Sequence, residues 1–232
     1  MRLAAIVGVA ASTIGAVLAR AGMPRLAEVD RLTGELLRGR RHSEVRYERE
    51  QPGELLHVDV KKLGRVPDGG GWRVHGRREE VRGRGNGFDY VHVAIGDHSR
   101  LAYSELLADE RKETAAAFWT RADAYYASCG ITVRRVLTDN GACYRSFDFR
   151  DALAGIAHKR TRPYRPATNG KVERFHRTLL EEWAYARPYA SNAEREAAYP
   201  AWLHRYNHHR GHTALNGRPP ASRVTNLSGQ NS

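Results

Sequence analysis

The sequence contains little cysteine and no long apolar run. Cys129 and Cys143 are the two cysteines in 232 residues, and they form no Cys-x-x-Cys pair, so the sequence suggests no disulfide framework and fits a reducing compartment. No segment is apolar over enough residues to be a convincing membrane span. The glycine clusters lack a following Lys-Ser or Lys-Thr, which argues against nucleotide binding, and Ser99 and Ser104 have no partners typical of a nucleophilic triad.

Acidic residues are outnumbered by basic ones. Lys and Arg number 38 against 26 Asp and Glu, which gives a net charge of +12 and a pI of about 10.1. Such an excess favours a polyanionic partner, because neutralising phosphates releases condensed counterions. Charge alone also leaves open a merely basic protein. The hydrophobic content of 41% is enough for one sizeable core with a small appendage.

The N-terminal segment, residues 1–22, supports two interpretations. Its early Arg2, apolar run and small residues resemble a secretory signal peptide. The same residues also predict two short helices, one at residues 3–6 and one at 13–20 with Ser12 as its cap. We favour the second interpretation, a partial helix-turn-helix DNA-binding segment, with Ser12 and Thr13 as DNA contacts. On this interpretation the protein acts in the cytoplasm.

The remaining sequence predicts an α/β fold with a mixed sheet flanked by helices. Residues 23–50 read as a basic linker, 51–190 as the core and 191–232 as a C-terminal helix and tail. Three strands form an antiparallel meander, and a helical crossover makes the fourth strand parallel to a neighbour. The strands are expected at 55–60, 90–95, 101–106, 133–138 and 158–161, and the helices at 112–128, 147–154, 169–187 and 193–206.

Side-chain periodicity adds detail to three of these elements. Residues 64–87 are rich in Gly and Arg and predict an exposed excursion between two strands. In the first strand His57 and Asp59 share one face, and the apolar residues share the other. The helical stripe at 112–128 is expected to bury Phe118, Ala122, Tyr125 and Cys129, and the stripe at 169–187 to bury Val172, Phe175, Leu179 and Trp183.

Three carboxylates stand out from these patterns. Asp59 lies in an otherwise apolar strand, where an unpaired charge is costly, although a solvent-facing strand end would explain it too. Asp139 follows an apolar run and, taken alone, is an ordinary turn residue. Glu173 lies at the border of a buried helical stripe, and an ion pair with Arg177 is the simpler account of it. It is the one acid in a window of seven basic residues: Lys159, Arg160, Arg162, Arg165, Lys171, Arg174 and Arg177.

Together the three acids match a chemical requirement. Hydrolysis of a phosphodiester with two Mg²⁺ ions needs oxygen ligands on rigid elements that hold the ions roughly 3.5–4 Å apart. We therefore expect Asp59, Asp139 and Glu173 to bind metal, and the surrounding bases to grip DNA.

Three segments of the sequence resemble the signature blocks of DDE transposases with a retroviral-integrase-type core. These segments are HVD at 57–59, LTDNG at 137–141 and YRPATNGKVERFH at 164–176, and the third is highly specific. The segments DHSR at 97–100, YNHHR at 206–210 and LNGRPP at 215–220 also resemble blocks of that family. The likeness covers about residues 1–223 and is greatest to bacterial insertion-sequence transposases.

The resemblance implies a fold, a reaction and partners. It implies a ribonuclease-H-like core, Mg²⁺ or Mn²⁺ as cofactor, donor-end cleavage with strand transfer, and a homo-oligomer on double-stranded DNA of transposon ends and target. Carried over by position, Asp59, Asp139 and Glu173 bind metal, and Lys171 and Asn169 meet DNA near the scissile phosphate. The other expected DNA contacts are basic or polar neighbours of these residues: Arg162, Arg165, Arg174, Arg177 and His176.

Departures from the family pattern leave other interpretations open. The interval between Asp139 and Glu173 holds 33 residues, two fewer than is typical of the family. Gly96 stands where a second Asp is usual, Gly211 stands where a Pro is usual, and the chain opens inside what resembles a longer DNA-binding region. A catalytically inactive DNA-binding remnant and a metal-dependent nuclease that cuts without joining are therefore the alternatives. A histidine cluster at 204–212 also admits a zinc site, a DNA-facing helix end or a solvated helix end.

Overall fold

The computed structural model describes residues 7–24, 48–76, 87–161 and 170–224, and the chain divides into two compact units, Met1–Tyr47 and Glu48–Ser232. The described part of the first unit holds helix α2, Ala11–Arg20, none of whose residues is buried. The expected cap was wrong: Ala10 occupies the N-cap position with no side-chain hydrogen bond, so Ser12 lies inside the first turn. The helix expected at residues 3–6 lies outside the described residues.

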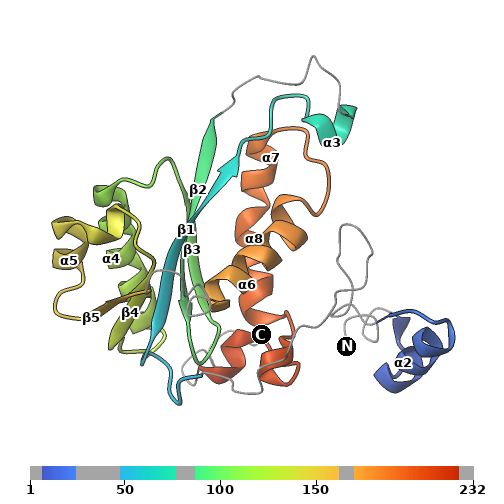
Figure 1. Cartoon of the computed structure of the whole chain (residues 1–232). Coiled ribbons are helices and arrows are strands. Elements are labelled where there is room, and N and C mark those ends of the chain that lie inside the picture. The colour runs from blue at the N-terminus through green and yellow to red at the C-terminus, as the bar shows by residue number, and fades with distance from the viewer. Residues whose placement is uncertain (1–6, 25–47, 77–86, 162–169, 225–232) are drawn as a thin grey trace. The chain divides into compact units, whose positions relative to one another are not determined.

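A five-stranded mixed sheet organises the second unit (Figure 1). Its order is β3-β2-β1-β4-β5, with β1–β2 and β2–β3 antiparallel and with β1–β4 and β4–β5 parallel. The predicted meander and the predicted parallel fourth strand are therefore confirmed. The strands are β1 Leu56–Gly64, β2 Phe88–Gly96, β3 Ala102–Leu107, β4 Arg135–Thr138 and β5 Ala157–Arg160.

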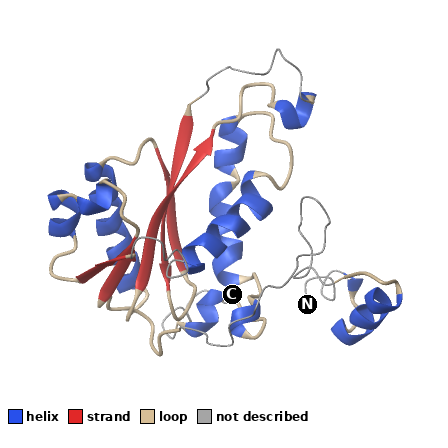
Figure 2. Cartoon of the chain, in the orientation of Figure 1, coloured by secondary structure: helices blue, strands red, loops and turns tan. Residues whose placement is uncertain are grey.

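Helices cover both faces of this sheet (Figure 2). One face packs Leu56 and Val58 of β1 against α4 and α5, in a core that includes Phe118 and Phe149. The other face packs the alternate residues of β2, such as Val93, against α6 and α8. The helices are α4 Lys112–Ser128, α5 Phe147–Ala152, α6 Gly170–Leu179, α7 Asn192–Ala197 and α8 Tyr199–His208.

Helix α4 has the predicted bounds but a slightly different buried stripe. Phe118 and Ala122 are fully buried as expected, whereas Tyr125 is only half-buried. Tyr126 is buried in its place, because its hydroxyl donates to the backbone carbonyls of Ala94 and Leu101 at 2.9 and 2.8 Å. A phenol can enter a core when its polar end finds acceptors there.

Helix α6 buries Val172, Phe175 and Leu179, and the π-helical turn Leu180–Ala184 that continues it buries Trp183, so all four predicted core residues are buried. The helix predicted at 193–206 was wrong in one respect, because the chain forms two helices, α7 and α8, separated at Ala198. Pro200 explains the break: proline provides no N–H for the carbonyl four residues earlier, and its ring crowds that carbonyl.

The excursion between β1 and β2 contains a four-residue helix, α3 Trp72–His75, and its residues 77–86 lie outside the described part. After α8, two 3₁₀ turns, Thr213–Leu215 and Pro220–Arg223, close the described chain. Residues 191–224 thus belong to the same compact unit as the sheet. No helix among the described residues is both long and apolar enough to cross a membrane.

Candidate active site

Asp59 lies in β1, and Asp139 directly follows β4, the parallel strand beside it. In the β1–β4 register His57 pairs with Leu137, so each aspartate is two residues beyond a paired residue. Adjacent strands are about 4.8 Å apart. Asp59 is on the face that α6 covers, where His176 of that helix contacts it, and Asp139 is close enough to raise the pKa of Asp59.

Glu173 reaches this region from the first turn of α6. The buried stripe of the helix, with Val172 fully buried and Phe175 1% exposed, fixes its rotation against the sheet. Glu173 is the residue next to Val172 and is exposed at the border of that stripe, as predicted. The alternative ion pair with Arg177 is not formed among the described residues.

The electrostatics of Asp59 link the three acids. Burial is the largest cause that raises the pKa of Asp59, from 3.8 to about 7, and repulsion from Asp139 and from Glu173 adds to it. The N–H of Val60 and the charge of Lys61 lower the pKa and only partly offset the increase. Both other carboxylates are thus close enough to disfavour a charge on Asp59.

The loop after β4 orients Asp139. The N–H of Gly141 donates to Asp139 Oδ1 at 2.7 Å, and Asn140 donates from its side chain to the carbonyl of Thr161 at 2.9 Å. A Cβ at residue 141 would lie 2.9 Å from the same Asp139 oxygen, so glycine permits this close approach. The Asp-Asn-Gly sequence therefore forms a short turn that holds the carboxylate at the end of the strand.

His176 was predicted to contact DNA, and the structure places it beside Asp59. Its side chain is buried, and its Nδ1 lies 3.6 Å from Asp59 Oδ2. Burial, together with the nearby Lys61, lowers the pKa of His176 to about 3, so the ring is neutral at physiological pH. His176 therefore packs against Asp59 without forming an ion pair. The sequence contained the signal, because residue 176 is one helical turn after Val172 and on the same stripe.

The donor set fits a hard divalent cation. Carboxylate oxygens are the ligands that Mg²⁺ and Mn²⁺ prefer, and a cation would relieve the repulsion that raises the pKa of Asp59. Among the described residues, however, no three His, Cys, Asp or Glu side chains lie close enough together to enclose one ion. Charge repulsion acts over longer distances than metal coordination. The three carboxylates therefore influence one another electrostatically, but in the described chain they are not close enough together to coordinate one ion.

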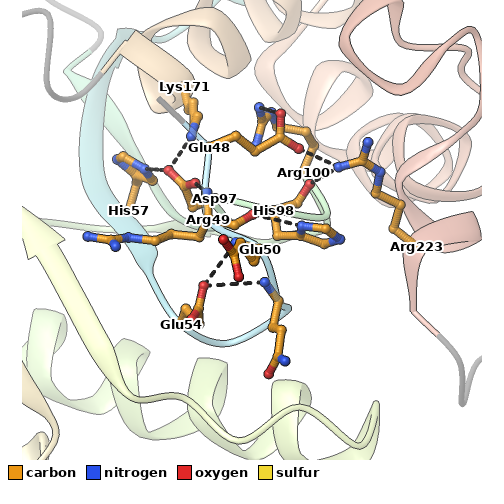
Figure 3. A network of polar contacts seen from close by, with 11 residues as sticks. Glu48, Arg49, Glu50, Glu54, His57, Asp97, His98, Arg100, Lys171 and Arg223 are labelled. Atoms are coloured by element: carbon orange, nitrogen blue, oxygen red, sulfur yellow. Dashed lines mark hydrogen bonds and ion pairs between the residues drawn. The ribbon is translucent and has the colours of Figure 1, made fainter. Parts of the chain in front are cut away.

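No role was predicted for Asp97 from the sequence. Its carboxylate contacts a histidine, a lysine and a backbone N–H (Figure 3). It is completely buried directly after β2, and its carboxylate contacts His57 Nε2 at 2.8 Å, the N–H of Arg49 at 2.7 Å and the Lys171 ammonium. Burial opposes its ionisation, but these hydrogen bonds prevail and hold the pKa of Asp97 well below its usual range. Lys171, expected to meet DNA, is thus paired with a protein carboxylate here.

The other predicted DNA contacts are distributed over several segments. Arg174 and Arg177 are exposed on α6, and Ser12 and Thr13 are exposed on α2. The remaining three, Arg162, Arg165 and Asn169, lie outside the described residues.

The histidine cluster forms ring contacts at the end of α8. The rings of His204 and His208 stack with centroids 4.6 Å apart, and His209 Nε2 lies 3.3 Å from His204 Nε2. No group of three potential ligands in the described part of the chain could hold a metal, and this includes the histidines.

Sequence comparison connects the chain to integrases. Residues 49–166 match the integrase core domain family, and a second integrase core domain description matches residues 154–220. A curated relative, the ORF3 protein of Spiroplasma virus SpV1-C74, which is named as an integrase, is 24% identical over 154 residues. That match covers 60% of this chain and 42% of the relative, so the chain spans less than half of the relative's length.

Structural comparison gives the same fold. A chain of the simian T-cell lymphotropic virus intasome, in complex with PP2A regulatory subunit B56 gamma, matches with a TM-score of 0.58 and 18% identity, over 77% of this chain and 56% of that one. The magnesium-bound catalytic core of HTLV-2 integrase matches with a TM-score of 0.53 and 15% identity, over 75% and 98%. The BIV integrase core matches with 0.50 and 21%, over 74% and 93%. The predicted ribonuclease-H-like α/β fold is confirmed, and the chain belongs to the integrase core domain family.

Proposed function

We propose that this protein is a DNA transposase that cuts the ends of an insertion sequence and joins them to target DNA, with Asp59, Asp139 and Glu173 as its metal-binding carboxylates. One observation carries the proposal. In a fold of the integrase core type, Asp59 has a pKa raised to about 7 by burial and by both of the other acids. A carboxyl whose pKa is raised by burial and by two other acids is more typical of a functional site than of a structural one.

The residues around the acids suit a nucleic-acid substrate. The β5 residues Lys159 and Arg160 and the α6 residues Arg174 and Arg177 are exposed near the two ends of the segment that joins these elements. Guanidinium and ammonium groups bind phosphate oxygens and position a duplex without reading its sequence. The net charge of +12 adds long-range attraction.

Each acid has a definite part in this proposal. Asp59, in β1, and Asp139, directly after β4, would hold the cations on the sheet side, and Glu173 would complete the ligand set from the helix side. Two Mg²⁺ or Mn²⁺ ions held there would supply the positive charge needed to activate the attacking oxygen and to stabilise the leaving oxygen. The carboxylates remain unreacted and supply position and negative charge. Cation binding lowers the pKa of Asp59, because an adjacent positive charge favours the carboxylate.

The test is a cleavage and joining assay. Purified protein is incubated with labelled insertion-sequence end DNA and Mg²⁺ or Mn²⁺, and nicked and joined products are separated on a denaturing gel. We expect both products, and we expect Asp139→Asn to abolish them while Asp68→Asn, a change at an exposed aspartate outside the site, does not. Unchanged activity of Asp139→Asn would refute the assignment.

A second candidate is a catalytically inactive protein that occupies DNA ends. The observation in its favour is that the three acids do not close around one point within the described residues. DNA binding without cleavage under either metal would support it. A nuclease that cuts without joining is distinguished in the same assay, because a joined product requires a captured 3′-hydroxyl.

The proposal includes the partners. Double-stranded DNA is the substrate, and copies of the chain assemble on it in the bacterial cytoplasm, at the nucleoid. The likeness to a chain of a viral intasome supports assembly on DNA. Gel-shift titration with cross-linking would measure the number of copies on each end.

A further inference from the structure

Asp97 is the most completely enclosed charged group near the three acids. Its side chain is fully buried in the turn after β2, and its hydrogen bonds within the described chain go to groups other than Asp59, Asp139 and Glu173. A buried carboxylate is stable only with donors that compensate for lost hydration. The identity of those donors indicates what Asp97 does.

The donors come from three separate elements. His57 is part of β1, and its Nε2 lies 2.8 Å from Asp97 Oδ1. Lys171 pairs with the same oxygen from the first turn of α6. The backbone N–H of Arg49, in the segment before β1, donates to Oδ2 at 2.7 Å. One carboxylate therefore links the central strand, the helix on its face and the chain that enters the sheet (Figure 3).

Two of these donors are close in sequence to the site. His57 precedes Asp59 by two residues on β1 and shares its face. Lys171 precedes Glu173 by two residues in α6, in the helical turn that follows residues 162–169. Because a strand and a helical turn are rigid over two residues, the position of Asp97 constrains the backbone positions of Asp59 and Glu173.

A second set of contacts fixes the turn that carries Asp97. His98 Nδ1 lies 2.8 Å from the carbonyl of Arg49, and Arg100 pairs with Glu48 at 3.5 Å. Arg223, in the last 3₁₀ turn of the described chain, pairs with Glu48 and donates to the carbonyl of His98 at 3.0 Å. These contacts hold the turn in place, so they also fix the position of Asp97.

We propose that Asp97 is a positioning residue that sets the separation of Asp59 and Glu173 by holding His57 and Lys171 on one carboxylate. This inference rests on the proposed function, since it concerns the same three acids. It assigns to Asp97 no contact with DNA or metal. Loss of its charge would release the first turn of α6, so that Glu173 must be ordered when the cation binds.

The experiment compares Asp97→Asn with a matched control, Asp89→Asn. Asp89 is also a buried aspartate of the β2 region that ties the sheet to a helix, through Arg195 of α7 at 3.1 Å, but it is at the other end of the strand. Both variants lose one buried charge and both should lower thermal stability. Two readouts are measured: the Mn²⁺ concentration that gives half-maximal cleavage, and the amide hydrogen exchange of residues 170–176 in the metal-free protein.

We expect Asp97→Asn to raise the half-maximal Mn²⁺ concentration at least tenfold and to accelerate exchange at residues 170–176 at least tenfold, and Asp89→Asn to do neither. An unchanged metal requirement, or an equal shift in the control, would overturn the inference. If the wild-type protein cleaves no DNA, the proposed function fails, and exchange alone then decides the positioning role. If Asp97→Asn does not fold, Lys171→Met removes the α6 contact alone. Unchanged exchange in that variant would also overturn the inference.

Discussion

Replacement of Asp59 by asparagine should stabilise the metal-free protein at alkaline pH. The folded protein resists ionisation of Asp59, because burial and then the charges of Asp139 and Glu173 raise its pKa from 3.8 to about 7. In the unfolded chain the carboxyl ionises near 3.8. The ionised residue therefore destabilises the fold, and the neutral amide removes this effect.

The size of the effect follows from the shift. At about 1.4 kcal/mol for each pH unit, a shift from 3.8 to about 7 corresponds to about 4 kcal/mol. The Asp59 side chain is 19% exposed, so water screens part of this energy, and about 2–4 kcal/mol is expected at pH 8.

The pH dependence of the free energy of unfolding shows that Asp59→Asn should be stabilising. Below pH 3.8 Asp59 is protonated in both states, and no penalty exists. As pH rises towards 7, the unfolded chain releases the proton while the folded protein retains it, so the free energy of unfolding falls. Above about pH 7 the full penalty is present. The advantage of Asp59→Asn over wild type should therefore increase between pH 5 and pH 8, by about 1–3 kcal/mol.

Urea denaturation measures this difference. Wild type, Asp59→Asn and the exposed control Asp68→Asn are unfolded in chelator from pH 5 to pH 8, and free energies are obtained by linear extrapolation. The control should follow wild type at every pH. A constant gap between wild type and Asp59→Asn, or a gap that narrows as pH rises, would show that the folded protein does not raise the pKa of Asp59.

Three other predictions concern the site and its support. Asp139→Asn should lower the pKa of Asp59, because it removes the larger of the two repulsive charges. A ¹³C NMR titration of the Asp59 carboxyl would detect this change, and an unchanged pKa would show that Asp139 does not repel Asp59. Gly141→Ala should reduce cleavage more than stability, because a Cβ 2.9 Å from Asp139 Oδ1 displaces that carboxylate; assays of both properties on one preparation test it, and full activity would contradict it. Asp89→Ala should destabilise the protein by about 3–5 kcal/mol, because it leaves the buried Arg195 without its carboxylate; a loss below about 1 kcal/mol in urea would refute this.

Local patterns were sufficient to predict most of the fold. The strands and long helices follow from apolar periodicities of two and of about 3.6, which depend on neighbours in sequence alone. The face that Asp59 shares with His57 and the buried stripe of α6 were predictable for the same reason. The break between α7 and α8 was also predictable, since Pro200 marks it, but the apolar pattern on both sides concealed it.

The three acids of the candidate site could be proposed from the sequence, but their geometry could not. Asp59, Asp139 and Glu173 were proposed from residue type and resemblance, and both of the other acids raise the pKa of Asp59. Their separation depends on packing among elements far apart in the chain. Asp97 shows the difficulty most clearly, because two of its partners, His57 and Lys171, are 40 and 74 residues away, and no local pattern reports such contacts.

Strand β5, at one edge of the sheet, restricts how copies of this protein can associate. It spans only Ala157–Arg160, and its Lys159 and Arg160 are exposed. Short edge strands bearing like charges do not readily accept a further strand from another molecule. Two copies would place these cations against each other if their sheets were joined through β5. We therefore expect subunits not to pair through this strand, and its cations to remain available to a phosphate backbone.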